Sequence, residues 1–165
     1  MTEVSVREPE PGDIPALVML NNAAVPAVNR LSEASVAELL AMALWSRVAA
    51  AADRPLGWLL VLAQGAPYDS LNYRWFAERY DRFAYIDRAI VADEARGRGI
   101  GGHLYDALLE APEMLDRVIT CEVNERPPNP GSLRFHQRFG FAEVGRQETE
   151  GGAKAVILMA RPAHR

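Results

Sequence analysis

The most informative segment of this chain is Arg96-Gly97-Arg98-Gly99-Ile100-Gly101-Gly102. An apolar, β-prone run at 83–91 leads into it, and a helical run at 103–115 follows it. Four glycines in seven residues leave backbone N–H groups uncovered, because glycine has no Cβ to block a ligand. Those N–H groups lie at a helix start, where donors lack partners and the helix dipole favours negative charge. The segment therefore predicts a loop that binds a phosphate-bearing cofactor, with two arginines to pair with phosphate oxygens.

Two familiar glycine patterns fit this segment poorly. The Walker pattern fails because no Lys-Ser/Thr follows the glycines. The dinucleotide pattern Gly-x-Gly-x-x-Gly matches Gly97, Gly99 and Gly102 literally, and Glu122 lies near the distance expected for a ribose-binding acid. A doubly wound domain would need several further βαβ units. The residues that follow the cofactor helix predict only one strand, one short helix and a hairpin, so a nicotinamide dinucleotide protein is the weaker interpretation.

A third pattern, Arg/Gln-x-x-Gly-x-Gly/Ala, is met by Arg96, Gly99 and Gly101. In this pattern the chain resembles the GNAT superfamily of N-acetyltransferases, whose corresponding motif cradles the pyrophosphate of acetyl-CoA. Four further segments are similar to elements of that family: its fourth strand, its third helix, its fifth strand, and its closing helix with a Gly-Phe ending. They are Tyr85–Ala92, Gly99–Leu115, Val118–Asn124 and Asn129–Phe141.

The resemblance implies a mixed α/β (α+β) fold. We expect a single GNAT-like domain over residues 1–165, with a mostly antiparallel mixed sheet of about seven strands. About four helices would cover both faces of the sheet, and strands four and five would splay apart around acyl-CoA. The hairpin at 142–160 would turn at Gly151-Gly152, which can supply the positive φ angles of a tight turn.

Local patterns predict the elements of the N-terminal half. Asp13 is a candidate N-cap for a helix that runs to about Ala24. The pair Ser35 and Glu38 forms a capping box ahead of a second helix that ends near Leu44. Two apolar strands follow at 45–51 and 57–63, and helical spacing of aromatic residues predicts a short helix around 75–80.

Composition limits the class of protein. With 165 residues, 49% of them hydrophobic and 24% charged, the chain has the composition of a soluble globular domain. The net charge of −4 and the pI near 5.4 argue against a general nucleic-acid or membrane-surface binder. The single cysteine, Cys121, excludes an internal disulfide, which fits a reducing cytosol. Because Cys121 lies in an apolar run, we expect it to be buried in the core and not to act as a nucleophile. We expect a cytoplasmic protein with no metal; homodimerisation through the hairpin or the aromatic segment is compatible with the sequence.

The cofactor-binding residues follow from the resemblance. The whole segment from Arg96 to Gly102 would hold the pyrophosphate. The end of the family's fourth strand supplies backbone N–H groups to the thioester and pantetheine, which points to Ile90 and Val91. Asn129 matches the family's asparagine that contacts the CoA arm, and the same helix adds Ser132 and Phe135 to the predicted cofactor set.

Three residues are candidates for proton transfer. The family often places a tyrosine in its final helix to protonate the leaving thiolate, and the aligned residue here is His136. Histidine titrates near 6.5 rather than near 10, so His136 would donate as imidazolium or as a neutral N–H; alternatively it only packs against CoA. Asp87 and Glu122, on adjacent predicted strands, are candidate bases for the amine, although ion pairing is the common fate of a single carboxylate.

The acceptor pocket is predicted from polar and aromatic side chains. Asn21 belongs to the segment around the first two helices, which covers the acceptor pocket in the resembled family; it also fits a simple helix end. Tyr68, Tyr73 and Trp75 stand in a long connection at 64–82, where amphipathic aromatics either line a pocket or form a satellite cluster. Asn124, at the end of the fifth strand, completes this set.

The sequence thus predicts an acyltransferase that moves an acyl group, expected to be acetyl, from acetyl-CoA to a primary amine of a small molecule or peptide. The first alternative is a non-catalytic acyl-CoA-binding module, which the missing tyrosine suggests. The second is the nicotinamide dinucleotide protein, which rests on the literal glycine match alone.

Overall fold

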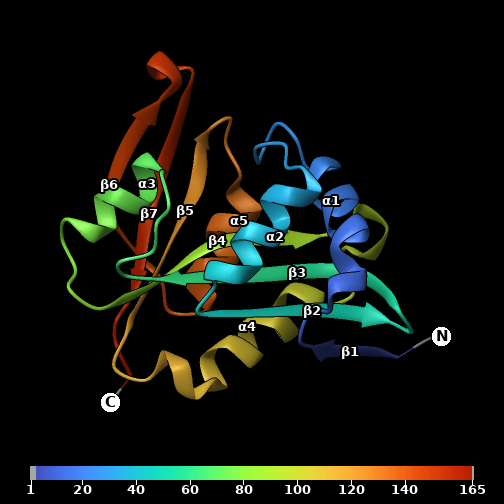
Figure 1. Ribbon diagram of the computed structural model, residues 1–165. Helices are drawn as coiled ribbons and strands as arrows, with labels where there is room; N and C mark the ends of the chain where they lie inside the picture. The colour runs from blue at the N-terminus through green and yellow to red at the C-terminus, as the bar shows by residue number, and fades with distance from the viewer. Residues whose placement is uncertain (1–2, 165) are drawn as a thin grey trace. The chain divides into compact units, whose positions relative to one another are not determined.

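The computed structural model describes residues 3–164. Its seven strands form one mixed sheet in the order β1-β2-β3-β4-β5-β7-β6, and five α-helices accompany it (Figure 1). The strands are β1 (Val4–Arg7), β2 (Trp45–Ala51), β3 (Arg54–Ala63), β4 (Phe83–Val91), β5 (Val118–Arg126), β6 (Ala142–Thr149) and β7 (Lys154–Arg161). The helices are α1 (Ile14–Asn22), α2 (Glu33–Met42), α3 (Leu71–Ala77), α4 (Ile100–Glu110) and α5 (Pro130–Arg138). The predicted fold is confirmed, with one helix more than expected.

The parallel pairing of β4 with β5 is short. It joins Phe83, Ala84 and Tyr85 to Val118, Ile119 and Thr120. The neighbouring pairs β1–β2, β2–β3, β5–β7 and β6–β7 are antiparallel. A ladder of three residue pairs between two nine-residue strands is what the predicted splay requires.

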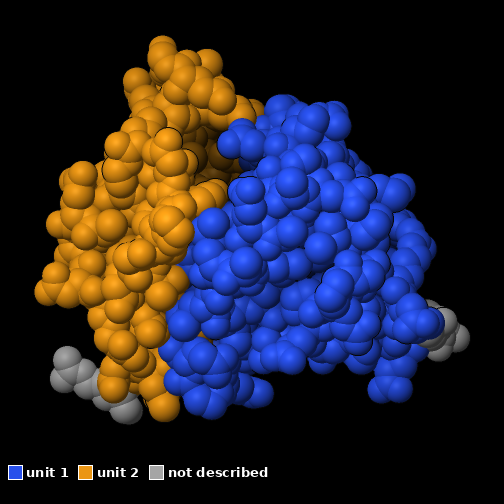
Figure 2. Space-filling view, in the orientation of Figure 1, with its two compact units in different colours: residues 1–62, 87–113 blue, residues 63–86, 114–165 orange. Residues whose placement is uncertain are grey.

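The chain divides into two compact units, which Figure 2 shows in different colours. Unit 1 comprises residues 1–62 and 87–113, and unit 2 comprises residues 63–86 and 114–165. In unit 1, α1 packs on α2, and α4 packs against β1 and β2. Large apolar side chains fill this unit. One buried polar pair in it is fully connected: the Trp58 indole donates to Ser46 Oγ at 3.0 Å, and Ser46 Oγ donates to the Leu59 carbonyl at 2.9 Å.

Unit 2 is built on the antiparallel strands β5, β7 and β6 with α3 and α5. Helix α3 lies against β6, because Trp75 packs directly on Gly145 and Gln147 donates to Asn72 at 2.8 Å. A Cβ on Gly145 would stand 2.9 Å from Cη2 of Trp75, so this contact requires glycine. The hairpin turns with positive φ at Gly151 and Gly152, as predicted.

One predicted helix start is wrong, and the other is at the predicted position without the predicted side-chain cap. Helix α2 begins one turn early, since its N-cap is Ser32, whose Oγ accepts from the Ser35 N–H at 3.1 Å. Asp13 precedes α1, but its carboxylate accepts from the Glu10 N–H at 2.7 Å and pairs with Arg7 instead of capping that helix. Arg7 thereby lowers the pKa of Asp13. Within residues 3–164, no helix has the length and apolar character needed to cross a membrane.

Candidate active site

The glycine segment joins the end of β4 to α4 in unit 1. Gly99 is the N-cap of α4 and adopts the left-handed conformation, with φ of 76°. Gly97 also has a positive φ, of 79°. L-residues avoid this region, so the two glycines are required by the backbone path. No side chain caps α4, and its first-turn N–H groups therefore keep their hydrogen-bonding capacity for a ligand.

The surface of this loop is open at two of its glycines, as the predicted binding of a pyrophosphate requires. A Cβ built on Gly97 or on Gly102 would meet no heavy atom within 4 Å. Arg98 is exposed, and exposed Arg96 pairs with Asp93 at 3.1 Å. Bare N–H donors, the positive end of an eleven-residue helix and two arginines form a donor set that fits a pyrophosphate. The residues present thus fit the pyrophosphate of CoA.

Helix α4 is seated on the sheet by a close approach at Gly57 of β3. A Cβ there would lie 2.8 Å from Ile100 Cγ2, 3.1 Å from Leu104 Cδ1 and 3.3 Å from the Ile90 carbonyl oxygen. The Ala92 N–H donates to the Leu56 carbonyl at 2.8 Å, which fixes the end of β4. The predicted backbone donors Ile90 and Val91 lie on this fixed strand end, buried and half-buried respectively.

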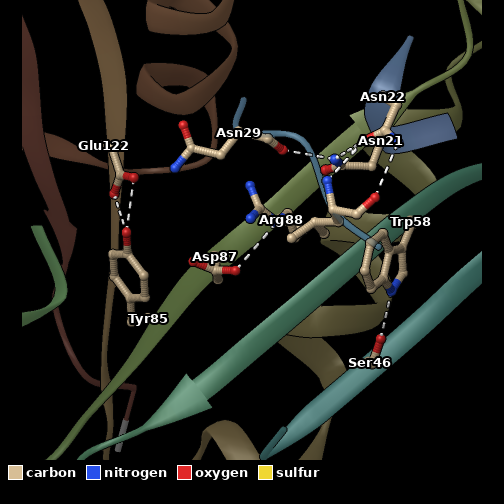
Figure 3. A network of polar contacts seen from close by, with 10 residues as sticks. Asn21, Asn22, Asn29, Ser46, Trp58, Tyr85, Asp87, Arg88 and Glu122 are labelled. Atoms are coloured by element: carbon tan, nitrogen blue, oxygen red, sulfur yellow. Dashed lines mark hydrogen bonds and ion pairs between the residues drawn. The ribbon is translucent and has the colours of Figure 1, made fainter. Parts of the chain in front are cut away.

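The two candidate bases have different partners (Figure 3). Asp87, in unit 1, is buried beside Arg88, and its Oδ2 lies 3.4 Å from Arg88 Nε. Glu122, in unit 2, accepts from the Tyr85 hydroxyl at 2.8 Å and 2.7 Å through its two oxygens. Sequence reasoning missed Tyr85 as a partner of Glu122, although the parallel register of β4 and β5 places Tyr85 opposite Thr120, two residues away.

His136 is buried on α5 in unit 2. Its Nδ1 lies 2.8 Å from the Ser132 carbonyl oxygen, and because a carbonyl only accepts, Nδ1 carries the proton in this hydrogen bond. Burial lowers the pKa of His136 below its ordinary 6.5. In the neutral ring the proton is engaged with Ser132, so donation from Nε2 to a thiolate would require the imidazolium form that burial disfavours.

The predicted CoA-arm residues stand at the start of α5. Asn129 is its N-cap, with Oδ1 accepting from the Ser132 N–H at 3.2 Å, and Pro130 follows at the first helical position, as predicted. The Phe135 ring lies 5.4 Å from that of His136. These contacts explain local structure; the contact of Asn129, Ser132 and Phe135 with CoA stays a prediction.

The aromatic residues of segment 64–82 are engaged in packing within unit 2. Tyr73 is buried, and its hydroxyl donates to the Ala63 carbonyl at 2.5 Å and accepts from the Ala66 N–H at 3.0 Å. Half-buried Tyr68 meets the Tyr73 ring edge-on at 5.8 Å. Trp75, already placed on Gly145, is covered by the Arg79 guanidinium at 3.8 Å. The satellite cluster weighed above therefore has direct contacts in its favour.

The remaining acceptor candidates also have structural contacts. Asn21 is fully buried at the end of α1 and donates to Asn22 Oδ1 at 3.0 Å and to the Asn29 carbonyl at 2.8 Å. The Asn22 side-chain amide in turn donates to the Leu31 carbonyl at 3.0 Å and accepts from the Leu31 N–H at 2.9 Å. Asn21 and Asn22, which Figure 3 shows side by side, thus hold the α1–α2 connection. In unit 2, the main-chain carbonyl oxygen of half-buried Asn124 accepts from the Asn129 N–H at 3.1 Å.

Comparison with known proteins now decides the family. The model of the acetyltransferase (GNAT) family matches residues 29–141, a span that contains β4, the glycine segment, α4, β5 and α5. The chain belongs to the GNAT acetyltransferase family. A GNAT enzyme transfers an acetyl group from acetyl-CoA to an amine, which confirms the predicted cofactor and reaction and removes the nicotinamide alternative.

Solved structures share the GNAT fold over nearly the whole chain. Ard1 from Thermoplasma volcanium superposes with a TM-score of 0.75 at 19% identity, covering 98% of this chain and 99% of its own. Arabidopsis thaliana Naa50, in complex with the bisubstrate analogue CoA-Ac-MVNAL, gives 0.70 at 18% identity, with coverage of 96% and 97%. A GNAT-family acetyltransferase from Streptococcus pneumoniae gives 0.73 at 18% identity, with coverage of 98% and 100%. The comparison with curated proteins finds no match.

Proposed function

We propose that this GNAT enzyme acetylates a primary amine of a small molecule or peptide and binds the pyrophosphate of acetyl-CoA at Arg96–Gly102. One observation carries the assignment of the loop. The N-terminus of α4 has no side-chain cap, and it is approached by glycines whose missing Cβ atoms leave the surface clear at Gly97 and Gly102. A helix start with bare N–H groups is a binding site for a dianionic group.

The chain's own contribution to the reaction is positioning. Acetyl-CoA supplies an already activated acyl group. Backbone N–H groups near Ile90 and Val91, held by the fixed end of β4, orient the carbonyl and bind the negative charge that develops on its oxygen. Holding an amine against a fixed carbonyl lowers the barrier by up to about 7–11 kcal/mol.

The amine must lose a proton before or during attack. The proposed proton acceptors, acting directly or through water, are Glu122 and Asp87. Glu122 accepts a hydrogen bond from the Tyr85 hydroxyl, and Asp87 is paired with Arg88. His136 is proposed to orient the start of α5 through Ser132, with thiolate protonation as a further role that its imidazolium form would serve.

The acceptor class is proposed from chemistry and from one neighbour. The bisubstrate analogue bound to Naa50 joins CoA to a peptide, which supports a peptide amine as acceptor. The proposed acceptor-side residues remain Asn21, Tyr68, Tyr73, Trp75 and Asn124. The alternative is that they serve only the packing and hydrogen bonding described above. We also propose a cytoplasmic location, no nucleic-acid or membrane partner, and a capacity to form homodimers.

The deciding experiment incubates the protein with acetyl-CoA and a panel of amines, amino acids and short peptides, and follows free thiol release. Release that depends on one acceptor class establishes the enzyme and its substrate. If acetyl-CoA raises the melting temperature but no acceptor releases thiol, the enzyme assignment fails and the non-catalytic module gains. If acetyl-CoA leaves the melting temperature unchanged, the loop assignment fails.

A further inference from the structure

Arg88 is an unusual arginine of unit 1. Its side chain is only 8% exposed, although a guanidinium carries five N–H donors that need acceptors when buried. Within residues 3–164 its recorded partner is Asp87, the next residue along β4, at 3.4 Å from Nε. That distance lies outside the 2.7–2.9 Å of a strong charge-assisted hydrogen bond, and the buried Nε makes no hydrogen bond in the described structure.

Another arginine of the same unit shows what a structural pair looks like here. Arg7 donates from both terminal nitrogens to Asp13, at 2.8 Å and 2.9 Å, in the two-pronged geometry that suits a carboxylate. Arg88 has no such two-pronged contact with Asp87: Nε lies 3.4 Å from Oδ2 and makes no hydrogen bond. Its terminal nitrogens are therefore the part of the guanidinium that structural contacts leave for another acceptor.

The position of Arg88 on β4 relates it to the reaction. It stands two residues before Ile90, on the same strand face, so the two lie roughly 6.6 Å apart along the strand. An arginine side chain spans that distance. If the thioester lies near Ile90, as the proposed function requires, Arg88 reaches the group next to the reacting amine.

We propose that Arg88 binds a carboxylate of the acceptor that lies close to the acceptor amine. The inference rests on the proposed function and adds its substrate class: a free amino acid, or a peptide with an acidic residue next to its N-terminus. The Asp87 carboxylate beside Arg88 disfavours an anion that carries no ammonium group, since like charges repel. The charged pair suits a zwitterionic acceptor, with both signs of charge within a few bonds.

The test compares matched acceptors that differ only in one carboxyl group. Alanine is set against alaninamide, and Ala-Glu-Ala-amide against Ala-Gln-Ala-amide, which separates the free amino acid from the acidic peptide. We expect the carboxylate member of one pair to be favoured at least about tenfold in kcat/KM, and Arg88→Met to bring that ratio close to one. Arg7→Met is the matched control: it removes a structural ion pair of the same unit and should lower the melting temperature without changing the ratio.

A binding readout keeps the inference separate from the reaction. Titration calorimetry with the same four acceptors, in the presence of CoA, which carries no acetyl group to transfer, should show the same carboxylate preference. If Arg88→Met does not fold, Arg88→Lys keeps the charge without the planar fork and should reduce the preference several-fold. Equal binding of all pairs by the unmodified protein, or a preference that survives in the Arg88 variants, overturns the proposal. Carboxylate-selective binding without thiol release would overturn the proposed function and leave Arg88 assigned.

Discussion

Two helix starts in this protein use opposite solutions to the same problem. Helix α5 begins with Asn129, whose side chain accepts a first-turn N–H, and with a proline that has no N–H to satisfy. Helix α4 begins with Gly99, which offers no side chain, and two of its first three residues are glycines. At the α5 start a side chain of the helix itself accepts a backbone N–H, whereas no side chain does so at the α4 start.

This difference separates stability from binding at a helix start. A cap adds about 0.5–2 kcal/mol to stability and uses donors that a ligand would need. Substitutions at the two starts should therefore move melting temperature and acetyl-CoA affinity in different directions.

The largest effect is expected for Gly102→Glu. A carboxylate in the first turn of α4 suits the helix dipole, so the melting temperature without ligand should hold or rise by a few degrees. The same carboxylate occupies the proposed pyrophosphate position, and acetyl-CoA affinity should fall more than about tenfold by calorimetry. Gly12→Glu, at an open position outside the loop, should leave affinity unchanged. Unaltered affinity in Gly102→Glu would place the pyrophosphate elsewhere.

The next effect concerns the seating of α4. Gly57→Ala forces a Cβ against Ile100 and a backbone oxygen, which should cost about 1–3 kcal/mol of unfolding free energy and weaken acetyl-CoA binding. Gly145→Ala crowds Trp75 in unit 2 and should destabilise by a similar amount with affinity retained. Chemical denaturation and calorimetry on both variants check this contrast. Equal losses of affinity would contradict it.

A smaller effect is expected at the α5 start. Asn129→Ala removes the cap and should lower stability by about 1 kcal/mol, or about 2–4 °C in melting temperature. Asn129→Asp keeps a capping oxygen and should restore most of that loss. If acetyl-CoA affinity falls in both variants, the amide itself contacts the CoA arm; if it falls in neither, Asn129 acts only as a cap.

The smallest effect is a pH dependence from His136. Because burial lowers its pKa in the folded protein, the unfolded chain binds a proton near pH 6.5 that the folded chain does not. Stability should therefore decline as pH falls below about 6.5 through the lowered pKa. Melting curves between pH 7.5 and 5.5 should show a shallower decline for His136→Gln. Parallel curves for the two proteins would mean that His136 titrates normally.

The elements of the C-terminal half could be predicted because short sequence signals specify their backbone conformation. Gly99 and Gly97 mark positive φ angles, and the apolar run at 83–91 that precedes them became β4 at the same boundaries. Asn129 followed by Pro130 is a strong helix start in any context. Signals of this kind depend on neighbours in sequence, so one chain suffices to recognise them.

Other residues depended on contacts that sequence alone does not supply. Tyr73 looked amphipathic, and only the fold supplies Ala63 and Ala66 as partners for its hydroxyl. Ser32 and Ser35 stand three residues apart, and either could cap α2 until the path of the chain selects Ser32. In the sequence Arg88 is only a charged residue on a predicted strand. Its burial and its poor pairing with Asp87 are visible only in the structure.

The burial of Cys121 makes thiol-labelling experiments on this protein straightforward to interpret. This buried thiol on β5 has a pKa raised well above its usual value by desolvation, so it is a poor nucleophile in the folded protein. A thiol-specific dye added to a native reaction mixture should count released CoA without a background from the enzyme. In denaturant the same cysteine becomes reactive, and the rate at which the dye labels it would time the opening of the sheet around β5.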